Sequence, residues 1–265
     1  MDMIILKLGG SVITDKSKEC FFRKEIVDNL SKQIKKANKE IILVHGAGSF
    51  GHIQAEKFKL NNGYFDKKQL HGFSVTHERV QRLNTLVLKS LQDNGISAVS
   101  ISPHSIVKLD NHKLADMNYN IFEEYLKNQF TPVTFGDVVL DKKLRFSICS
   151  GDLLSIALAN HFKPEKVIYV IDVDGLYTSN PKINKNAKLL ESSTIEQLEN
   201  FSTSLDSHAD VTGGMGGKLD AIKTIAKLGM NTILVNGNKP DRLYKLLVEE
   251  NAQSTIIYGG RNEKN

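Results

Sequence analysis

Short apolar runs alternate with helix-like patterns along nearly the whole chain, and this alternation restricts the possible folds more than any other feature. The runs are almost continuously apolar, as is typical of strands covered on both faces. Such alternation with short links predicts an α/β fold, a three-layer αβα sandwich with an open, mainly parallel central sheet. The expected strands are Ile4–Leu8, Ile41–Val44, Ala98–Ile101, Thr131–Phe135, Val167–Ile171, Thr232–Val235 and Thr255–Ile257. The expected helices are Lys24–Ala37, Phe73–Asp93, Ile121–Asn128, Leu153–Phe162, Lys218–Leu228 and Arg242–Glu249.

Two segments interrupt the alternation and predict β-hairpins. In the first, the apolar runs Val138–Leu140 and Leu144–Ile148 flank a short polar turn. The second hairpin is expected around Asp110-Asn111-His112. We find no internal repeat, low-complexity segment or Pro/Gly-rich linker, so residues 1–265 are expected to form a single domain.

Composition limits the classes of protein that need to be considered. The two cysteines, Cys20 and Cys149, fit no metal-ligand spacing and are interpreted as reduced thiols. There is no apolar run of membrane-spanning length and no signal peptide, so we expect a cytoplasmic protein without membrane contact. The net charge of +5 comes from scattered lysines without stacking aromatics. This pattern favours a solvated surface over nucleic-acid binding, although the positive field would attract small anions.

Five glycine-rich turns follow the apolar runs. Ligands of open parallel sheets bind beyond the carboxyl ends of the strands, where glycine lets backbone N–H groups approach phosphate closely. Five such turns on one sheet therefore predict a phosphate-binding site rather than a set of tight connections. The turns are Leu6–Ser11, His45–His52, Ser150–Asp152, Asp172–Tyr177 and Asp210–Lys218.

Two of these turns resemble other nucleotide-binding motifs. Gly46–Gly51 satisfies GxGxxG, but Asp66, at the distance where the dinucleotide motif needs an acidic residue, lies in a polar stretch and not on a strand. The segment ending in Lys218 fails the P-loop pattern, because Thr212 replaces its first glycine and Leu219 its hydroxyl residue. Neither a dehydrogenase nor a P-loop fold is supported.

Taken together, the turns resemble the amino acid kinase superfamily. Its Lys-x-Gly-Gly-Ser start, glycine-rich second turn, Gly-Asp before a helix, Asp-x-Asp-Gly-x-Tyr strand end and late Gly-Gly-Met-x-x-Lys occur here in order, from Lys7 to Lys218. Ile171 and Leu153 depart from the residues that many relatives carry beside Asp172 and Asp152. The resemblance implies an amino acid kinase-like domain whose N-terminal half binds the acceptor and whose C-terminal half binds mainly ATP.

Within this superfamily, the second turn is similar to that of the isopentenyl phosphate kinases. The distinguishing residue is His52, which kinases for carboxylate substrates lack at this place. The resemblance implies ATP-dependent phosphorylation of isopentenyl phosphate to isopentenyl diphosphate in isoprenoid biosynthesis. Fosfomycin kinase shares this histidine, so a phosphonate or another small phosphate monoester remains an alternative acceptor. A nucleotide-binding regulatory module without catalysis is an alternative of another class.

The resemblance also assigns roles to single residues. Lys7 would bridge the two phosphate groups, Lys16 would stabilise the transferred phosphoryl group and Lys218 would hold ATP phosphate. Asp152 would orient the lysines, and Mg²⁺ would arrive with ATP rather than at a protein metal site. The predicted acceptor-binding residues are Ala47, Gly48, His52, Phe73, Thr76 and Gly151. The predicted ATP-binding residues are Lys7, Gly9, Gly10, Ser11, Gly48, Asp172, Asp174, Gly175, Tyr177, Pro181, Lys182, Gly214 and Lys218.

Several interpretations stay open from sequence. His52 would donate a hydrogen bond to the acceptor phosphate, or it caps or packs in the following helix. Phe73, Thr76 and Val80 would form an apolar wall for the acceptor tail, or they are ordinary core residues. Lys59–Leu70 is a mobile lid or a passive loop. A homodimer is expected by analogy with relatives.

The remaining histidines are interpreted without a functional role, because no pair has metal-ligand spacing on one helix: His45, His71, His77, His104, His112, His161 and His208.

Overall fold

The computed structural model describes residues 3–179, 184–198 and 215–260. Pro181, Lys182, His208, Thr212 and Gly214, together with the rest of the fifth glycine turn up to residue 214, lie outside these ranges. Among the described residues, no helix combines the length and the apolar character needed to cross a membrane.

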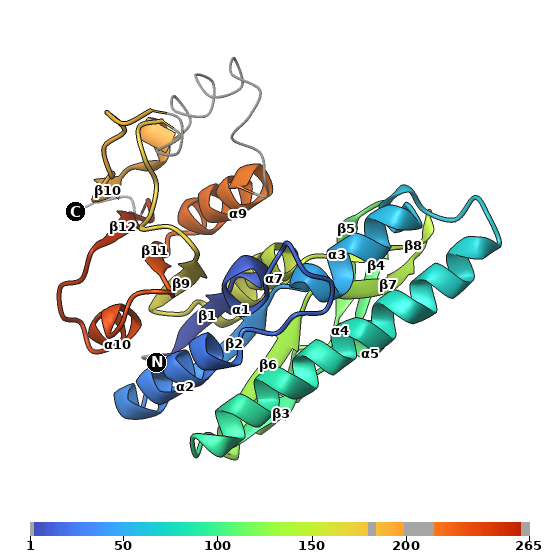
Figure 1. Ribbon diagram of the computed structural model, residues 1–265, viewed down its shortest axis with the longest axis horizontal. Coiled ribbons are helices and arrows are strands. Elements are labelled where there is room, and N and C mark those ends of the chain that lie inside the picture. Colours follow the sequence, from blue (N-terminus) through green and yellow to red (C-terminus); the bar gives the residue numbers. More distant parts are fainter. Residues whose placement is uncertain (1–2, 180–183, 199–214, 261–265) are drawn as a thin grey trace.

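The central sheet is open and mainly parallel. It is built, within the described residues, from β1 (Ile4–Leu8), β2 (Ile41–His45), β3 (Ala98–Ser100), β6 (Thr131–Phe135), β9 (Lys166–Ile171), β10 (Ser192–Ser193), β11 (Asn231–Asn236) and β12 (Ser254–Ile257). The strand order is β10-β12-β11-β9-β1-β2-β6-β3 (Figure 1). Every neighbouring pair is parallel except β11 and β12. β1 lies inside the sheet, with Ile4 opposite both Ile41 of β2 and Lys166 of β9.

Helices cover both faces of this sheet, which confirms the predicted αβα sandwich. One face packs on α1 (Gly10–Ile13), α2 (Lys24–Ala37), α3 (Gly48–Lys57), α4 (Lys68–Asp93) and α10 (Arg242–Leu247). The other packs on α6 (Asn120–Lys127), α7 (Gly151–Phe162) and α9 (Met215–Lys227). Side chains of β1 alternate between the two faces of the sheet: Ile4 and Leu6 lie on the face covered by α2, and Ile5 lies on the face covered by α7.

A second sheet extends the molecule beside α3 and α4 (Figure 1). It contains β4 (Val107–Asp110), β5 (Lys113–Met117), β7 (Asp137–Asp141) and β8 (Arg145–Cys149), in the order β5-β4-β7-β8. The two predicted hairpins are therefore confirmed, β7–β8 and β4–β5. The short helices η1 (Leu60–Asn62) and α5 (Pro103–Ile106) lie beside this sheet, in contact with β8 and β7 respectively.

One carboxylate joins the two hairpins. Asp141 accepts hydrogen bonds from the backbone N–H groups of Asn111 and His112 in one turn and of Lys143 and Leu144 in the other. Burial opposes its ionisation, but these N–H donors outweigh burial and hold the pKa of Asp141 well below its ordinary value. The carboxylate therefore fixes the side-by-side placement of the hairpins.

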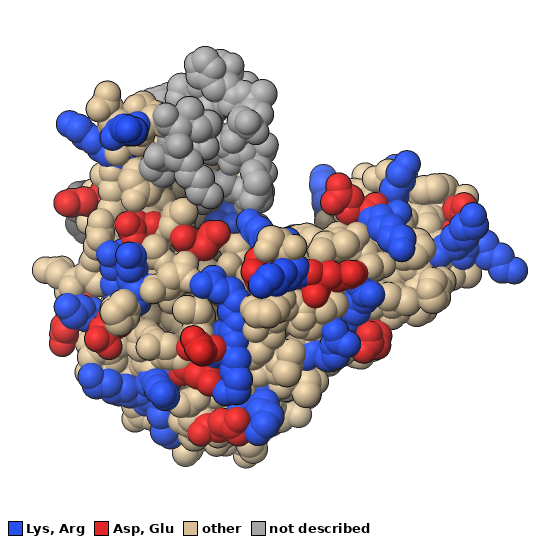
Figure 2. Space-filling view, in the orientation of Figure 1, with Lys and Arg blue, Asp and Glu red and all other residues tan. Residues whose placement is uncertain are grey.

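Basic and acidic side chains are interspersed over the face seen in Figure 2. Neither sign dominates a large area of that face. The positive charge that bears on function is instead concentrated in the interior cavity described next.

Candidate active site

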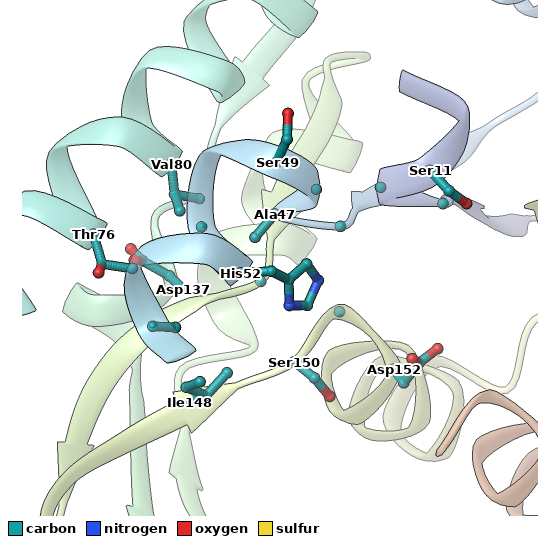
Figure 3. Close-up of a pocket in the computed structure, with 18 of the residues that line it drawn as sticks. Ser11, Ala47, Ser49, His52, Thr76, Val80, Asp137, Ile148, Ser150 and Asp152 are labelled. Atoms are coloured by element: carbon teal, nitrogen blue, oxygen red, sulfur yellow. The ribbon is translucent and has the colours of Figure 1, made fainter. Parts of the chain in front are cut away.

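A cavity of about 640 Å³ opens where β1, β2 and β6 end and the helices α3 and α7 begin. This is the carboxyl edge of the parallel strands, where ligands of such sheets bind. Figure 3 shows the His52 ring projecting from α3 toward the turn that carries Ser150 and Asp152, with Thr76, Val80 and Asp137 on its other side. The lining residues are Lys7, Gly9, Gly10, Ser11, Lys16, Gly46, Ala47, Gly48, Ser49, Gly51, His52, Ile53, Ala55, Thr76, Val80, Gly136, Asp137, Val138, Ile148, Ser150, Gly151, Asp152, Gly217 and Lys218.

The first two glycine turns are packed directly against each other. A Cβ atom on Gly10 would lie 2.6 Å from the backbone nitrogen of Gly48, and one on Gly46 would lie 2.7 Å from the backbone nitrogen of Gly10. The Thr14 hydroxyl connects the turns, because it donates to the Gly10 carbonyl at 2.7 Å and accepts from the Ser49 N–H at 3.0 Å. Glycine is required here so that two backbones can meet at one edge of the cavity.

The cationic end of the cavity is centred on Lys7. Its side chain lies on the α7 face of β1, and its ammonium group donates to Asp152 Oδ1 at 2.5 Å. Lys7 is almost completely buried, whereas Asp152 in the first turn of α7 is partly exposed. Because burial makes an unpaired ammonium unfavourable, Asp152 holds Lys7 in place as a charged group.

Lys16 and Lys218 bring further positive charge to this end. Burial lowers the pKa of Lys218, and the charge of Lys7 lowers it further while Asp152 opposes the shift. The pKa of His52 is lowered first by partial withdrawal from water and then by Lys16 and Lys7. Three lysine side chains thus line this end of the cavity, with Asp152 paired to Lys7 and with Asp172 acting on Lys218 as a further carboxylate. Such a group of ammonium donors suits an anionic ligand.

The opposite end of the cavity is lined mainly by apolar side chains, with the buried carboxylate of Asp137 beside them. Val80 comes from α4, Val138 and Ile148 come from the β7–β8 hairpin, and Ile53 and Ala55 come from α3. Thr76 also lines this end, but its hydroxyl donates to the Gly72 carbonyl of its own helix at 2.8 Å, so it presents little free polarity to a ligand. The cavity therefore has a cationic end and an apolar end.

Phe73 lies behind this wall and not in it. Its ring packs against Phe146 with centroids 5.4 Å apart, within the small cluster that supports the hairpin. The structure thus places Thr76 and Val80 on the cavity surface and Phe73 one layer further back. The prediction that Phe73 contacts the acceptor tail directly is not supported by this geometry.

The loop between α3 and α4 is held by a single buried amide. The Gln69 side chain accepts from the N–H groups of Phe65 and Asp66, and it donates to the carbonyls of Phe58, Lys59 and Gly63. This network gives the loop an internal structure of its own.

Four of the residues predicted to bind nucleotide, Asp172, Asp174, Gly175 and Tyr177, follow the end of β9, and Asn236 at the end of β11 lies beside them. Asp174 Oδ1 accepts from Arg242 at 2.6 Å and from Asn236 at 2.9 Å, while the Tyr177 hydroxyl donates to Asp174 Oδ2 at 3.4 Å. Partial burial opposes ionisation of Asp174, but Asn236 and Arg242 outweigh it and lower its pKa. Gly175 has a positive φ of 151°, and a Cβ atom there would lie 2.3 Å from the Thr255 hydroxyl. These residues form a structured edge next to the cavity lysines but do not line the cavity itself.

Comparison with known proteins agrees with this architecture. The sequence profile of the amino acid kinase family matches residues 2–236. The chain belongs to the amino acid kinase family. It is 36% identical to isopentenyl phosphate kinase from Methanothermobacter thermautotrophicus, over 97% of this chain and 99% of that protein. It is 35% identical to isopentenyl phosphate kinase from Methanocaldococcus jannaschii, over 94% and 96% of the two chains. A crystal structure of isopentenyl phosphate kinase superimposes with a TM-score of 0.85 at 33% identity, covering 96% of this chain and 99% of that one.

In this member of the amino acid kinase family, five predicted catalytic residues converge from distant parts of the sequence. Lys7, Lys16, His52, Asp152 and Lys218 all line one cavity. Gly9, Gly10 and Ser11 from the first turn line it as well, together with Ala47, Gly48 and Gly151. His52 is neither a helix cap nor buried packing, because its ring lies in the second turn of α3 and faces the cavity (Figure 3).

The sequence analysis missed a sixth glycine turn of this kinase-family chain. Gly136-Asp137 follows strand β6 directly, by the same rule that revealed the other five turns, and both residues line the cavity. The carboxylate of Asp137 is buried and accepts from His77 Nδ1 at 2.8 Å. Burial raises the pKa of Asp137, although His77 opposes the shift.

The fold brings two of the remaining histidines together. His77 on α4 and His104 on α5 lie with their ring centroids 4.2 Å apart. The sequence analysis considered only pairs on one helix and therefore could not foresee this approach. His45, by contrast, is a buried structural residue that contacts Asn84 and stacks on Phe135.

Proposed function

We propose that this chain is an ATP-dependent kinase that phosphorylates isopentenyl phosphate to isopentenyl diphosphate, a reaction of isoprenoid biosynthesis. The observation that carries the proposal is the division of the cavity into a cationic end and an apolar end. An acceptor with a phosphate head and a short branched hydrocarbon tail matches both ends. A carboxylate amino acid would place polar groups against Val80, Val138 and Ile148, which offer them no partner.

The relatives support the same acceptor. The archaeal proteins that align with nearly the whole chain, at 35–36% identity, are isopentenyl phosphate kinases. The superimposed structures include a substrate complex of isopentenyl phosphate kinase, at a TM-score of 0.82 and 28% identity. The shared fold extends over the turns that build the cavity.

In the proposed reaction, a phosphate oxygen of the acceptor attacks the γ-phosphorus of ATP. The bond from this phosphorus to the oxygen that bridges it to the β-phosphorus breaks, and ADP leaves with that oxygen. The acceptor oxygen is already anionic near neutral pH, so no strong general base is required. Lys7 would bridge donor and acceptor phosphates, Lys16 would meet the transferred group and Lys218 the ATP phosphates.

His52 would hold the acceptor phosphate. Partial withdrawal from water and the nearby lysines lower the pKa of His52, which favours the neutral ring with one N–H donor. That donor would bind a nonbridging oxygen, together with backbone N–H groups of the glycine turns at Gly48 and Gly151. A neutral donor positions the phosphate without adding a fourth positive charge beside the lysines.

The nucleotide would lie across the first turn and the ends of β9 and β11. The glycine backbones and the three lysines suit a polyphosphate, which supports ATP as the donor. Mg²⁺ bound by phosphate oxygens and water would supply further charge neutralisation. In this arrangement the N-terminal half holds the acceptor and the C-terminal half holds mainly ATP, within one domain. A homodimer in the cytoplasm, without nucleic-acid partners, remains part of the proposal.

The experiment that tests this function compares acceptors by ADP release with MgATP. Isopentenyl phosphate should give the highest kcat/KM in a series with fosfomycin, UMP and N-acetylglutamate. A preference for fosfomycin or another phosphate monoester would keep the lysine roles and replace the acceptor. ATP binding without turnover on any acceptor would favour the regulatory nucleotide-binding module and contradict the proposal.

A further inference from the structure

Behind the apolar wall of the cavity, three potential metal ligands from three elements lie together. They are His77 on α4, His104 on α5 and Asp137 at the start of β7, and their ligand atoms all lie within 4.8 Å of one another. We propose that this cluster is a binding site for a borderline transition-metal dication, with Zn²⁺ as the representative ion. The site is separate from the Mg²⁺ that accompanies ATP and does not depend on the proposed reaction.

The donor set selects this class of metal. Two imidazoles and one carboxylate are typical of zinc sites that leave a fourth position open to water. Mg²⁺ prefers an octahedron of oxygen ligands, so a site with two nitrogen donors discriminates against it. Ligand atoms bound to tetrahedral zinc at about 2.0–2.1 Å stand roughly 3.4 Å apart. The ligand atoms of the cluster now lie up to 4.8 Å apart, so the exposed His104 ring needs to move only a short way toward His77 and Asp137 to complete the site.

The surrounding residues hold the ligands in place. The His104 ring contacts the Ser102 hydroxyl through Nδ1 at 2.7 Å and the Ser105 hydroxyl through Nε2 at 3.2 Å. The Ser102 hydroxyl in turn accepts from the Gln81 side chain at 2.6 Å, one helical turn beyond His77 on α4. If one ring nitrogen binds the metal, the other keeps its hydroxyl partner, which is the kind of outer contact that orients ligating histidines.

Asp137 is the fixed member of the cluster. Its carboxylate is fully buried, and Oδ1 accepts from the N–H of Val138 at 2.8 Å while Oδ2 accepts from His77. A dication would add a charge partner to a carboxylate that burial otherwise penalises. Since Asp137 and Thr76 also line the cavity, the metal would join α4, α5 and β7 directly behind the acceptor wall.

The test is isothermal titration of the full-length protein with Zn²⁺, without nucleotide and in a large excess of Mg²⁺. The wild type should bind one zinc, and His104→Ala should weaken zinc binding by more than about tenfold. Loss of a residue that only orients a metal ligand already costs about tenfold in affinity, and loss of a ligand itself should cost more. His104 is exposed and outside the cavity, so this variant should keep the fold and the basal activity. His161→Ala is the matched control, because His161 is likewise an exposed histidine near a carboxylate, that of Glu123, but it lies on α7 away from the cluster.

Two further readouts distinguish a built site from adventitious binding. Co²⁺ should give the visible absorption of a tetrahedral complex in the wild type and in His161→Ala but not in His104→Ala. Because a ligand that binds only the folded state stabilises that state, Zn²⁺ should raise the Tm of the wild type and of His161→Ala but not the Tm of His104→Ala. The proposal is overturned if the wild type binds no zinc in magnesium buffer, or if His104→Ala binds it as tightly as the wild type.

Discussion

His52 lies between the lysines of the cavity and its apolar wall, and its role can be separated from that of the lysines. Replacing His52 with Ala removes one hydrogen-bond donor to the acceptor phosphate but no charge. We expect kcat/KM for isopentenyl phosphate to fall by about 10- to 100-fold, which corresponds to the loss of one hydrogen bond to a charged group. The Kd of ATP should stay nearly constant, because none of the proposed ATP contacts involves this ring.

Steady-state kinetics and ATP titration on the His52→Ala variant check this expectation. His161→Ala serves as the control, a histidine outside the cavity whose loss should change neither quantity. A large loss of ATP affinity in His52→Ala would show that His52 has a structural role instead.

His45 should make the stability of the fold depend on pH. Burial lowers its pKa below the ordinary value of 6.5, with hydrogen bonds to Gly46 and Asn84 opposing the shift. Below pH 6.5 the unfolded chain therefore binds a proton that the folded chain does not. The free energy of unfolding should fall as the pH drops through this range, by at most about 1.4 kcal/mol per pH unit for this one proton.

Urea unfolding at pH 7.5 and pH 5.5 measures this slope. A His45→Gln variant keeps a polar partner for Asn84 but has no proton to gain, so its unfolding free energy should fall less over the same interval. Equal slopes for the two proteins would exclude His45 as a source of the acid sensitivity.

Among the elements, the connection between the first two glycine turns offers the sharpest test of stability. Thr14→Val preserves shape but removes the hydroxyl that links the Gly10 carbonyl to the Ser49 N–H. Because the buried Ser49 N–H would lose its acceptor, we expect the free energy of unfolding to drop by about 1–3 kcal/mol. Activity should fall as well, since the linked turns form the floor of the cavity.

The matched control is Thr85→Val on the exposed side of α4. The Thr85 hydroxyl also donates to a backbone carbonyl, that of Gln81, but it is solvent-exposed. Its loss should change the unfolding free energy by less than about 0.5 kcal/mol. If both variants lose the same stability in denaturant titrations, the turn–turn hydrogen bonds contribute nothing specific.

The elements that sequence could predict are those with a strong local pattern. Strands such as Thr131–Phe135 and the amphipathic helix Lys24–Ala37 were predicted with their observed bounds, since burial on both faces or on one stripe leaves a clear signature. α4 begins five residues before its expected start, because its first turns are polar and Gln69 is buried for its hydrogen bonds rather than for apolar contact. A helix was expected to follow the second glycine turn, but no bounds were predicted for α3, because two glycines lie in its first turn.

The same distinction holds for the candidate site. Lys7, His52, Asp152 and Lys218 could be selected because each lies in a glycine turn that marks a strand end or a helix start. The cluster of His77, His104 and Asp137 could not, because three separate elements bring it together and no local spacing records that contact.

For the whole molecule, the two-ended cavity predicts that a ligand must occupy both ends to stabilise the fold strongly. Isopentenyl phosphate should raise the Tm more than methyl phosphate, which reaches only the lysines, or isopentenol, which reaches only the apolar wall. A ligand at 100 times its Kd contributes about 2.7 kcal/mol to the unfolding free energy. Thermal unfolding with equal concentrations of the three compounds measures the difference, and an equal shift for methyl phosphate would show that the apolar end is not used.

The position of β1 has a consequence for synthesis of the protein on the ribosome. This strand is made first, yet it pairs on one side with β2 and on the other with β9, which begins at Lys166. At elongation rates of about 5–20 residues per second, one edge of β1 waits roughly 10–30 s for its partner. During that interval the nascent chain exposes an apolar strand edge that invites association with other chains. Chaperone binding should therefore be stronger for chains stalled before residue 166 than for chains stalled after β9 has emerged from the ribosome.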